Sequence, residues 1–216
     1  MAHKLREQEV LFGAPEPKAK PAEPTLRPEA EYFHPGGKLL YTGSENCTDE
    51  ELLAILIGFG MRGRTAKQIA DDILMDWYSI NGLLNKWNKE TVTEKDLLAY
   101  KGMDRQKAGR VLAGLEIARR ICIASGFKGR TLDIRKDDRP DEEVLAHLFH
   151  DLHTNLTDAR DLARRFLAKY GDFLGMTGKP FQQMMRLKGL GQVKVARIGA
   201  VCDIAVRMVQ RESFNT

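Results

Sequence analysis

The stretch KGLGQVKVARIGAVCDIA, residues 188–205, places Gly189 and Gly191 one residue apart, just before apolar residues with helical spacing. A glycine readily adopts the positive φ that a tight helix exit requires, and Gly189 stands where a short apolar helix would end. Leu190 is predicted to anchor the turn in the core. A long helix is then expected from about Gln192, with its first N–H groups unpaired and the positive end of its dipole at the turn. The stretch therefore predicts a helix-hairpin-helix whose turn can hold an anion such as a DNA phosphate.

Basic residues around this turn favour the same interpretation. Lys188 precedes the glycines, and Lys194 and Arg197 lie in the first two turns of the expected helix, where they could flank the same phosphate. Residues 176–211 hold seven basic residues against one acidic residue, Asp203. A tight turn without any ligand is the simpler interpretation of Gly-x-Gly alone, but the local charge favours salt-sensitive binding to a polyanion. Such contact reads phosphates and not base edges, so we expect binding without sequence specificity.

The second half of the chain repeats the first. DEELLAIL at residues 49–56 returns as DEEVLAHL at residues 141–148, an offset of 92. Near the end of each half, the apolar positions of a long helix share the spacing 3, 4, 3, 4, which is typical of one buried helical stripe. These positions are Ala108, Val111, Leu115, Ala118 and Cys122 in the first half, and Val195, Ile198, Cys202, Ala205 and Val209 in the second. The sequence thus predicts two copies of a small helical unit.

The first copy carries a related turn with one important change. Asp104 stands where the second copy has its second glycine. Two interpretations stay open: Asp104 is a good helix N-cap, and its carboxylate would also repel a phosphate, so this hairpin either binds more weakly or serves packing only. The remaining candidate residues for phosphate contact in the first copy are Lys101, Gly102, Met103, Lys107 and Arg110.

The composition narrows the class of protein. The chain has 216 residues, 43% apolar and 30% charged, with a net charge of +4, so it can bury a core. No apolar run approaches the ~18–20 residues of a membrane helix, and the first residues lack the apolar core of a secretory signal. Cys47, Cys122 and Cys202 form no CxxC pair, which argues against a zinc knuckle or a disulfide framework. We therefore expect a soluble, cytoplasmic protein that binds no membrane.

Helix signals dominate from Thr48 onward, and no alternating apolar segment is long enough to indicate a sheet. Capping boxes are predicted at residues 48–51 and 65–68, with a weaker one at 93–96. The expected fold is all-α, with two tandem small helical domains that each contain a helix-hairpin-helix. The expected organisation is a disordered Pro-rich tail at residues 1–37, a first domain at 38–126, a linker at 127–139 and a second domain at 140–211.

Residues 38–120 resemble a known family. The segments DEELLAILIGFG, RGRT, INGLLN and LEIARR, at residues 49–60, 62–65, 80–85 and 115–120, resemble the N-terminal helix-hairpin-helix domain of the RadC family (UPF0758). Residues 141–211 resemble the same domain more faintly. The resemblance implies an all-α, DNA-binding-like module, associated by the family name with DNA repair. RadC proteins usually also carry a C-terminal metalloprotease-like (JAMM/MPN) domain with a His-x-His zinc motif, and this sequence has no such motif.

The residues of this sequence argue against the enzyme classes considered. His147, His150 and His153 are spaced by three and spread over about a third of a helix's circumference, so we expect solvent-facing or partly buried histidines in place of a metal site. Base-excision glycosylases contain the same hairpin, but the position of their lysine holds Gln106 in one copy and Val193 in the other. No other catalytic constellation is present, so we expect no enzymatic activity, cofactor or metal.

The expected function is non-enzymatic binding of duplex or branched DNA through backbone amides and flanking bases, in DNA repair or recombination. Two tandem hairpins could grip both strands of one minor groove. The alternative is a protein-interaction scaffold in which the same basic face meets an acidic partner. The Arg62-Gly63-Arg64 loop is open to two interpretations, a solvated turn and a second phosphate contact.

Overall fold

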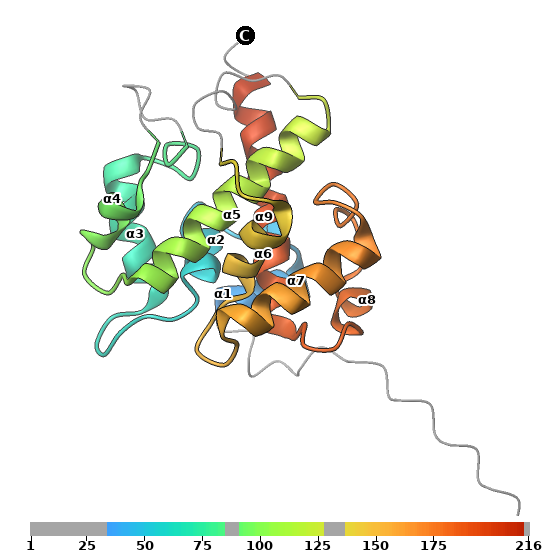
Figure 1. Ribbon diagram of the computed structural model, residues 1–216. Helices are drawn as coiled ribbons and strands as arrows, with labels where there is room; N and C mark the ends of the chain where they lie inside the picture. The colour runs from blue at the N-terminus through green and yellow to red at the C-terminus, as the bar shows by residue number, and fades with distance from the viewer. Residues whose placement is uncertain (1–33, 85–90, 128–136, 214–216) are drawn as a thin grey trace, which may run out of the picture.

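The computed structural model describes residues 34–84, 91–127 and 137–213 (Figure 1). Within these ranges the secondary structure is helical apart from two isolated bridges, which confirms the predicted all-α fold class. The elements are α1 (Pro35–Thr42), the 3-10 turn η2 (Ser44–Asn46), α2 (Asp49–Ile57), α3 (Ala66–Trp77), α4 (Glu94–Leu98), α5 (Arg105–Ala124), α6 (Asp141–Phe149), α7 (Leu156–Tyr170), α8 (Phe181–Met185) and α9 (Gln192–Ser213).

The helices begin where the sequence placed their caps. The side chains of Thr48, Thr65 and Thr93 each accept a hydrogen bond from the amide three residues later, and each capping box is complete. Helix α1 starts at Pro35, inside the predicted tail, because proline at the first helical position loses no intrahelical bond. The rest of the tail, residues 1–33, and most of the predicted linker, residues 128–136, lie outside the described residues, and the domain boundaries stay a prediction.

The same order of elements occurs twice. Helices α2 and α6 each end in a tight turn closed by an antiparallel bridge, Met61 with Arg64 and Asp151 with Thr154. A longer helix follows, then the short helix α4 or α8, then the long helix α5 or α9. This order matches the repeat read from the sequence.

The two long helices pack against each other at an angle, and both run toward the upper part of Figure 1. A Cβ atom on Gly114 would lie 3.4 Å from Cγ2 of Val201, and the Cys122 thiol lies 3.4 Å from the carbonyl oxygen of Ala205. Around them both halves contribute to one continuous apolar core. The apolar stripe predicted on α5 is fully buried, whereas Cys202 and Val209 of the α9 stripe are half-buried. The halves are therefore held together by shared burial.

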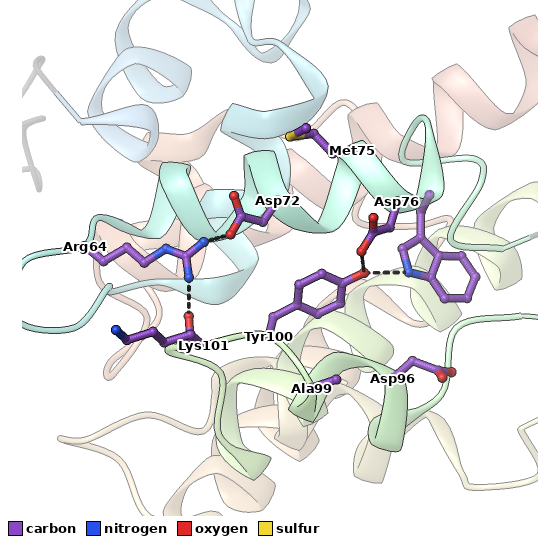
Figure 2. A pocket seen from close by; sticks show the side chains of 9 residues that line it. Arg64, Asp72, Met75, Asp76, Asp96, Ala99, Tyr100 and Lys101 are labelled. Atoms are coloured by element: carbon purple, nitrogen blue, oxygen red, sulfur yellow. Dashed lines mark hydrogen bonds and ion pairs between the residues drawn. The ribbon is translucent and has the colours of Figure 1, made fainter.

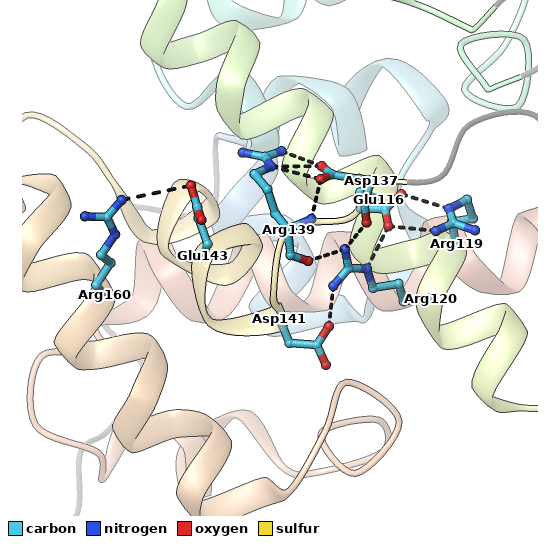
Figure 3. A network of polar contacts seen from close by, with 8 residues as sticks. All are labelled: Glu116, Arg119, Arg120, Asp137, Arg139, Asp141, Glu143 and Arg160. Carbon is cyan, nitrogen blue, oxygen red and sulfur yellow. Dashed lines mark hydrogen bonds and ion pairs between the residues drawn. The ribbon is translucent and has the colours of Figure 1, made fainter.

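Two arginines in the C-terminal parts of α5 and α9 form ion pairs that join the two halves. Arg207 of α9 binds Asp49 at the start of α2, with 2.6 Å between Nη1 and Oδ1. Arg120 of α5 binds Asp141 at the start of α6 and also Glu116, as part of the polar network in Figure 3. The carboxylates are well placed because the N-terminus of a helix favours negative charge.

The close contact between α5, α2 and α9 predicts opposite effects for two glycine substitutions in α5. A Cβ on Gly114 would lie 2.8 Å from Leu56 Cδ1 in the packed core, whereas a Cβ on Gly109 would meet only His147 Nδ1, at 3.7 Å. We expect Gly109→Ala to raise the free energy of unfolding by ~0.5–1 kcal/mol through better helix propensity. Gly114→Ala should lower the free energy of unfolding by ~1–3 kcal/mol through overpacking. Urea denaturation measures both, and equal stabilisation by the two would contradict this packing.

Candidate nucleic-acid interface

The turn before α9 has the geometry that the sequence predicted. Gly189 has φ +93°, and Leu190 is buried with 1% of its surface exposed. Gly191 has no need of positive φ, and a Cβ atom there would meet nothing within 4 Å. Lys188 and both glycines are exposed. The turn thus presents open backbone to solvent at the point where the first N–H groups of α9 lack intrahelical partners.

Two contacts from α7 and from the α6–α7 loop hold this turn in place. Arg165 of α7 donates a 2.9 Å hydrogen bond from Nη1 to the carbonyl oxygen of Lys188. Lys194 donates a 2.9 Å bond from Nζ to Oγ1 of Thr154 and lies 3.4 Å from Oδ2 of Asp151. The backbone of the turn is therefore positioned before any ligand arrives.

The turn before α5 is similar in backbone but different in chemistry. Gly102 has φ +100°, and a Cβ there would lie 2.7 Å from Ile69 Cδ1, so this glycine is required for packing. Asp104 caps α5 by accepting a 2.8 Å bond from the amide of Lys107, which confirms its capping role. Met103 is half-buried and Lys101 is exposed. The exposed carboxylate of Asp104 makes this turn less suited to an anion than the second one.

Arg64 ties this first turn down as Arg165 does the second. Its Nη1 donates a 2.9 Å bond to the carbonyl oxygen of Lys101, and its guanidinium pairs with Asp72. The sequence analysis did not identify Arg165 and left the role of Arg64 open, because each contact joins residues more than twenty positions apart.

Four of the predicted phosphate-binding cations are buried, which corrects the sequence analysis. Side-chain contact with a DNA phosphate needs exposure, yet 9% or less of each residue's surface is exposed. The four are Lys107, Arg110, Lys194 and Arg197. Within residues 176–211, Lys194 and Arg197 are thus internal, whereas Lys179, Arg186 and Lys188 are exposed and Arg207 is half-buried.

These cations serve the ends of helices. Arg110 donates from Nε to the carbonyl of Leu56 at 3.1 Å and from Nη2 to that of Ile57, at the C-terminus of α2. Arg197 donates from Nη1 to the carbonyl of Leu148 at 3.0 Å, at the C-terminus of α6. The last carbonyls of a helix lack intrahelical donors and carry the negative end of its dipole, so a buried guanidinium satisfies both needs.

The two arginines also lie close to each other. A Cβ on Gly58 would be 3.4 Å from Nη2 of Arg110 and 3.4 Å from Nη2 of Arg197. Burial and the charge of Arg197 lower the pKa of Arg110 to about 10, so Arg110 remains charged near neutral pH. Burial also lowers the pKa of Arg197. Asp151 lies 3.4 Å from Nη1 of Arg197 and supplies a compensating negative charge.

Both turns lie on the same side of the molecule. Arg110 and Arg197 approach each other, and each lies six residues after its turn, at Asp104 and Gly191. Each turn is therefore only ~9 Å along the helix axis from the point where the two arginines meet. The turns before α5 and α9 therefore lie on the same side of the contact between these two helices.

A groove of about 800 Å³ opens between α3 and the end of α4 (Figure 2). Tyr100 lies at its centre and donates a 2.8 Å hydrogen bond to Asp76, while it accepts a 3.2 Å bond from the indole of Trp77. Burial, together with the bond to Asp76, raises the pKa of Tyr100 to about 12. The walls carry Asp72, Asp76, Asp96, Arg64 and Lys101. Of the predicted site residues only Lys101 belongs to this groove.

The histidines lie as the sequence analysis expected. His147 and His150 are partly buried and His153 is exposed. Burial, with nearby arginines, lowers the pKa of both partly buried histidines. Among the residues that the structure describes, no cluster of His, Cys, Asp or Glu has the arrangement needed to hold a metal ion. Within the same residues, no helix is both long and apolar enough to cross a membrane.

Residues 29–109 match the family described as UPF0758 N-terminal, which confirms this part of the resemblance. Similar proteins, each named UPF0758 protein, include one from Flavobacterium johnsoniae, 38% identical over 103 residues, and one from Variovorax paradoxus, 32% identical over 150 residues. The matched regions cover 48% and 64% of this chain, and 42% and 63% of those relatives. The chain thus spans less than two thirds of the length of these relatives. No solved structure matches the chain significantly.

The buried ion pairs of Asp151 predict a pH-dependent stability. Burial alone would raise the pKa of Asp151, but the amide of His153 and the cations Lys194 and Arg197 outweigh it and hold that pKa below 3.8. We expect Asp151→Asn to lower the free energy of unfolding at pH 7 by ~2–4 kcal/mol, because two buried cations lose their partner.

Because the pKa of Asp151 is lower in the folded protein, its ionised form stabilises the fold at pH values above the usual pKa of 3.8. This contribution disappears as the pH falls through the lower pKa of the folded state. The difference between wild type and Asp151→Asn should therefore shrink below about pH 4. Urea denaturation between pH 2.5 and 7 measures it, with the exposed Asp138→Asn as the matched control. A difference that stays constant across this range would be inconsistent with the ion pairs.

Proposed function

We propose that this protein is a non-enzymatic DNA-binding module that contacts backbone phosphates through two helix-hairpin-helix turns, in the manner expected of a duplicated RadC-type N-terminal domain. The observation that carries the proposal is the turn at Gly189–Gly191, which is exposed and fixed in place at the N-terminus of α9. Backbone amides and the helix dipole favour an anion at such a position.

The shared orientation of the two turns supports binding to one DNA molecule. Parallel α5 and α9 put both turns on one face, where they can reach phosphates of two strands across a groove. The first turn contributes less, because Asp104 points a carboxylate into solvent beside Gly102. We therefore assign the main contact to Lys188, Gly189 and Gly191, with Lys101 and Gly102 as the secondary contact.

Exchanging the chemistry of the two turns tests this assignment. Gly191→Asp gives the second turn the aspartate that caps α5 in the first turn. The free energy of unfolding should therefore stay the same or rise slightly, while the new negative charge repels phosphate. We expect at least tenfold weaker DNA binding by fluorescence anisotropy. Asp104→Asn keeps the cap and removes the charge, so it should strengthen binding.

Gly191→Ala serves as the control for the loss of glycine without added charge. Thermal melts of all variants check the fold. Unchanged affinity in Gly191→Asp would mean that this turn does not meet the DNA.

The burial of four cations predicts a shallow salt dependence. One exposed lysine stands at each turn, Lys101 and Lys188, and each phosphate neutralised contributes ~0.9 to the slope of log affinity against log salt on duplex DNA. We expect a slope of about −2 for the wild type, reduced by about one in Lys188→Ala and in Lys101→Ala. Lys169→Ala on α7 should leave the slope unchanged. A wild-type slope of about −5 or steeper would contradict a contact limited to these two lysines and would indicate that further cations reach the DNA.

The second candidate function is a protein-interaction scaffold. The groove between α3 and α4 favours it, because Asp72, Asp76 and Asp96 surround an aromatic floor that suits basic side chains of a partner. Of the basic residues that the sequence suggested for this role, Lys101 and Lys188 are exposed and the other four are buried. A lack of DNA affinity even at low salt, together with a pull-down lost in Asp76→Lys, would favour the scaffold.

A further inference from the structure

Exposed apolar side chains lie beside the two turns, together with the exposed lysines Lys101 and Lys188. Leu152 is 70% exposed at the tip of the α6–α7 loop, and Val193 is 57% exposed in the first turn of α9. Lys194 joins the two elements through its bonds to Thr154 and Asp151, so the loop that carries Leu152 lies beside the first turn of α9, which carries Val193.

The first turn has apolar neighbours of its own. The Met61 sulfur would lie 3.2 Å from a Cβ on Gly102, and Met61 is 42% exposed. Phe59 is 36% exposed and covers Lys107 at the start of α5, with 4.5 Å between Nζ and the ring centroid. The face that carries both turns is therefore amphipathic: open backbone for phosphates, with apolar side chains beside it.

Regular duplex DNA offers little to such side chains, because its bases are stacked inside and its outer surface is charged. An unstacked or unpaired base step exposes apolar base faces, and DNA-binding proteins insert leucine, phenylalanine or methionine at such steps. Burial of a leucine side chain that is otherwise 70% exposed favours that encounter through the hydrophobic effect.

Resting on the proposed function, we propose that Leu152 and Val193 make the protein selective for DNA with an interrupted base stack, such as a branch point or a bulge, over regular duplex. The second turn holds a phosphate next to the interruption, and the two side chains cover the exposed base. The counterparts of these residues in the first half are Arg62 and Gln106, so the apolar pair belongs to the turn whose backbone is open.

The test compares a three-way DNA junction with a duplex of the same length and base composition, using fluorescence anisotropy. We expect the wild type to prefer the junction about tenfold, and Leu152→Ala/Val193→Ala to lose this preference while its duplex affinity changes less than twofold. The matched control is Met75→Ala/Val206→Ala, which removes similar side chains, 77% and 51% exposed, from other helices. This control should keep the preference.

A 2-aminopurine placed at the branch gives an independent readout. Its fluorescence should change when the wild type binds and stay nearly constant with Leu152→Ala/Val193→Ala. Duplex binding without a junction preference, or a preference that survives the double substitution, would overturn this inference and leave the proposed function standing. Failure of the wild type to bind either DNA would overturn both.

Discussion

Arg110 and Arg197 lie side by side in the interior, and the rest of the structure depends on where they bind. Each gives its guanidinium to the C-terminal carbonyls of a neighbouring helix, Arg110 to α2 and Arg197 to α6. Burying two like charges is unfavourable in free energy. The carbonyl oxygens, the helix dipoles and the carboxylate of Asp151 offset this desolvation and repulsion. The arrangement joins α5 to the end of α2 and α9 to the end of α6, next to the place where α5 and α9 meet.

The same helices are held at their other ends by arginines of the opposite half. Arg207 of α9 binds the start of α2, and Arg120 of α5 binds the start of α6. Helix α2 is thus fastened by α5 at one end and by α9 at the other. Together with the continuous apolar core, this makes the repeated halves one cooperative unit.

Much of the fold was predictable from local signals. Capping boxes at Thr48, Thr65 and Thr93, the positive φ of Gly189 and the buried stripe of α5 depend on residues a few positions apart, so the sequence pattern captures them. The candidate site was predicted only in part. A lysine or arginine at helical spacing shows which face of its own helix it occupies, but not whether another helix covers that face.

The sequence by itself determined that this chain is helical, that it repeats one pattern of elements, and where its glycine turns fall, because capping, helical periodicity and backbone freedom are local properties. Only the tertiary structure decided what its charges do. Lys107, Arg110, Lys194 and Arg197 have the spacing of a basic face and yet are buried, since the ends of α2 and α6 and the loops beside them approach from distant parts of the chain. Exposure is a property of the packed whole, and for that reason these four cations are internal while Lys101 and Lys188 stay exposed at the turns.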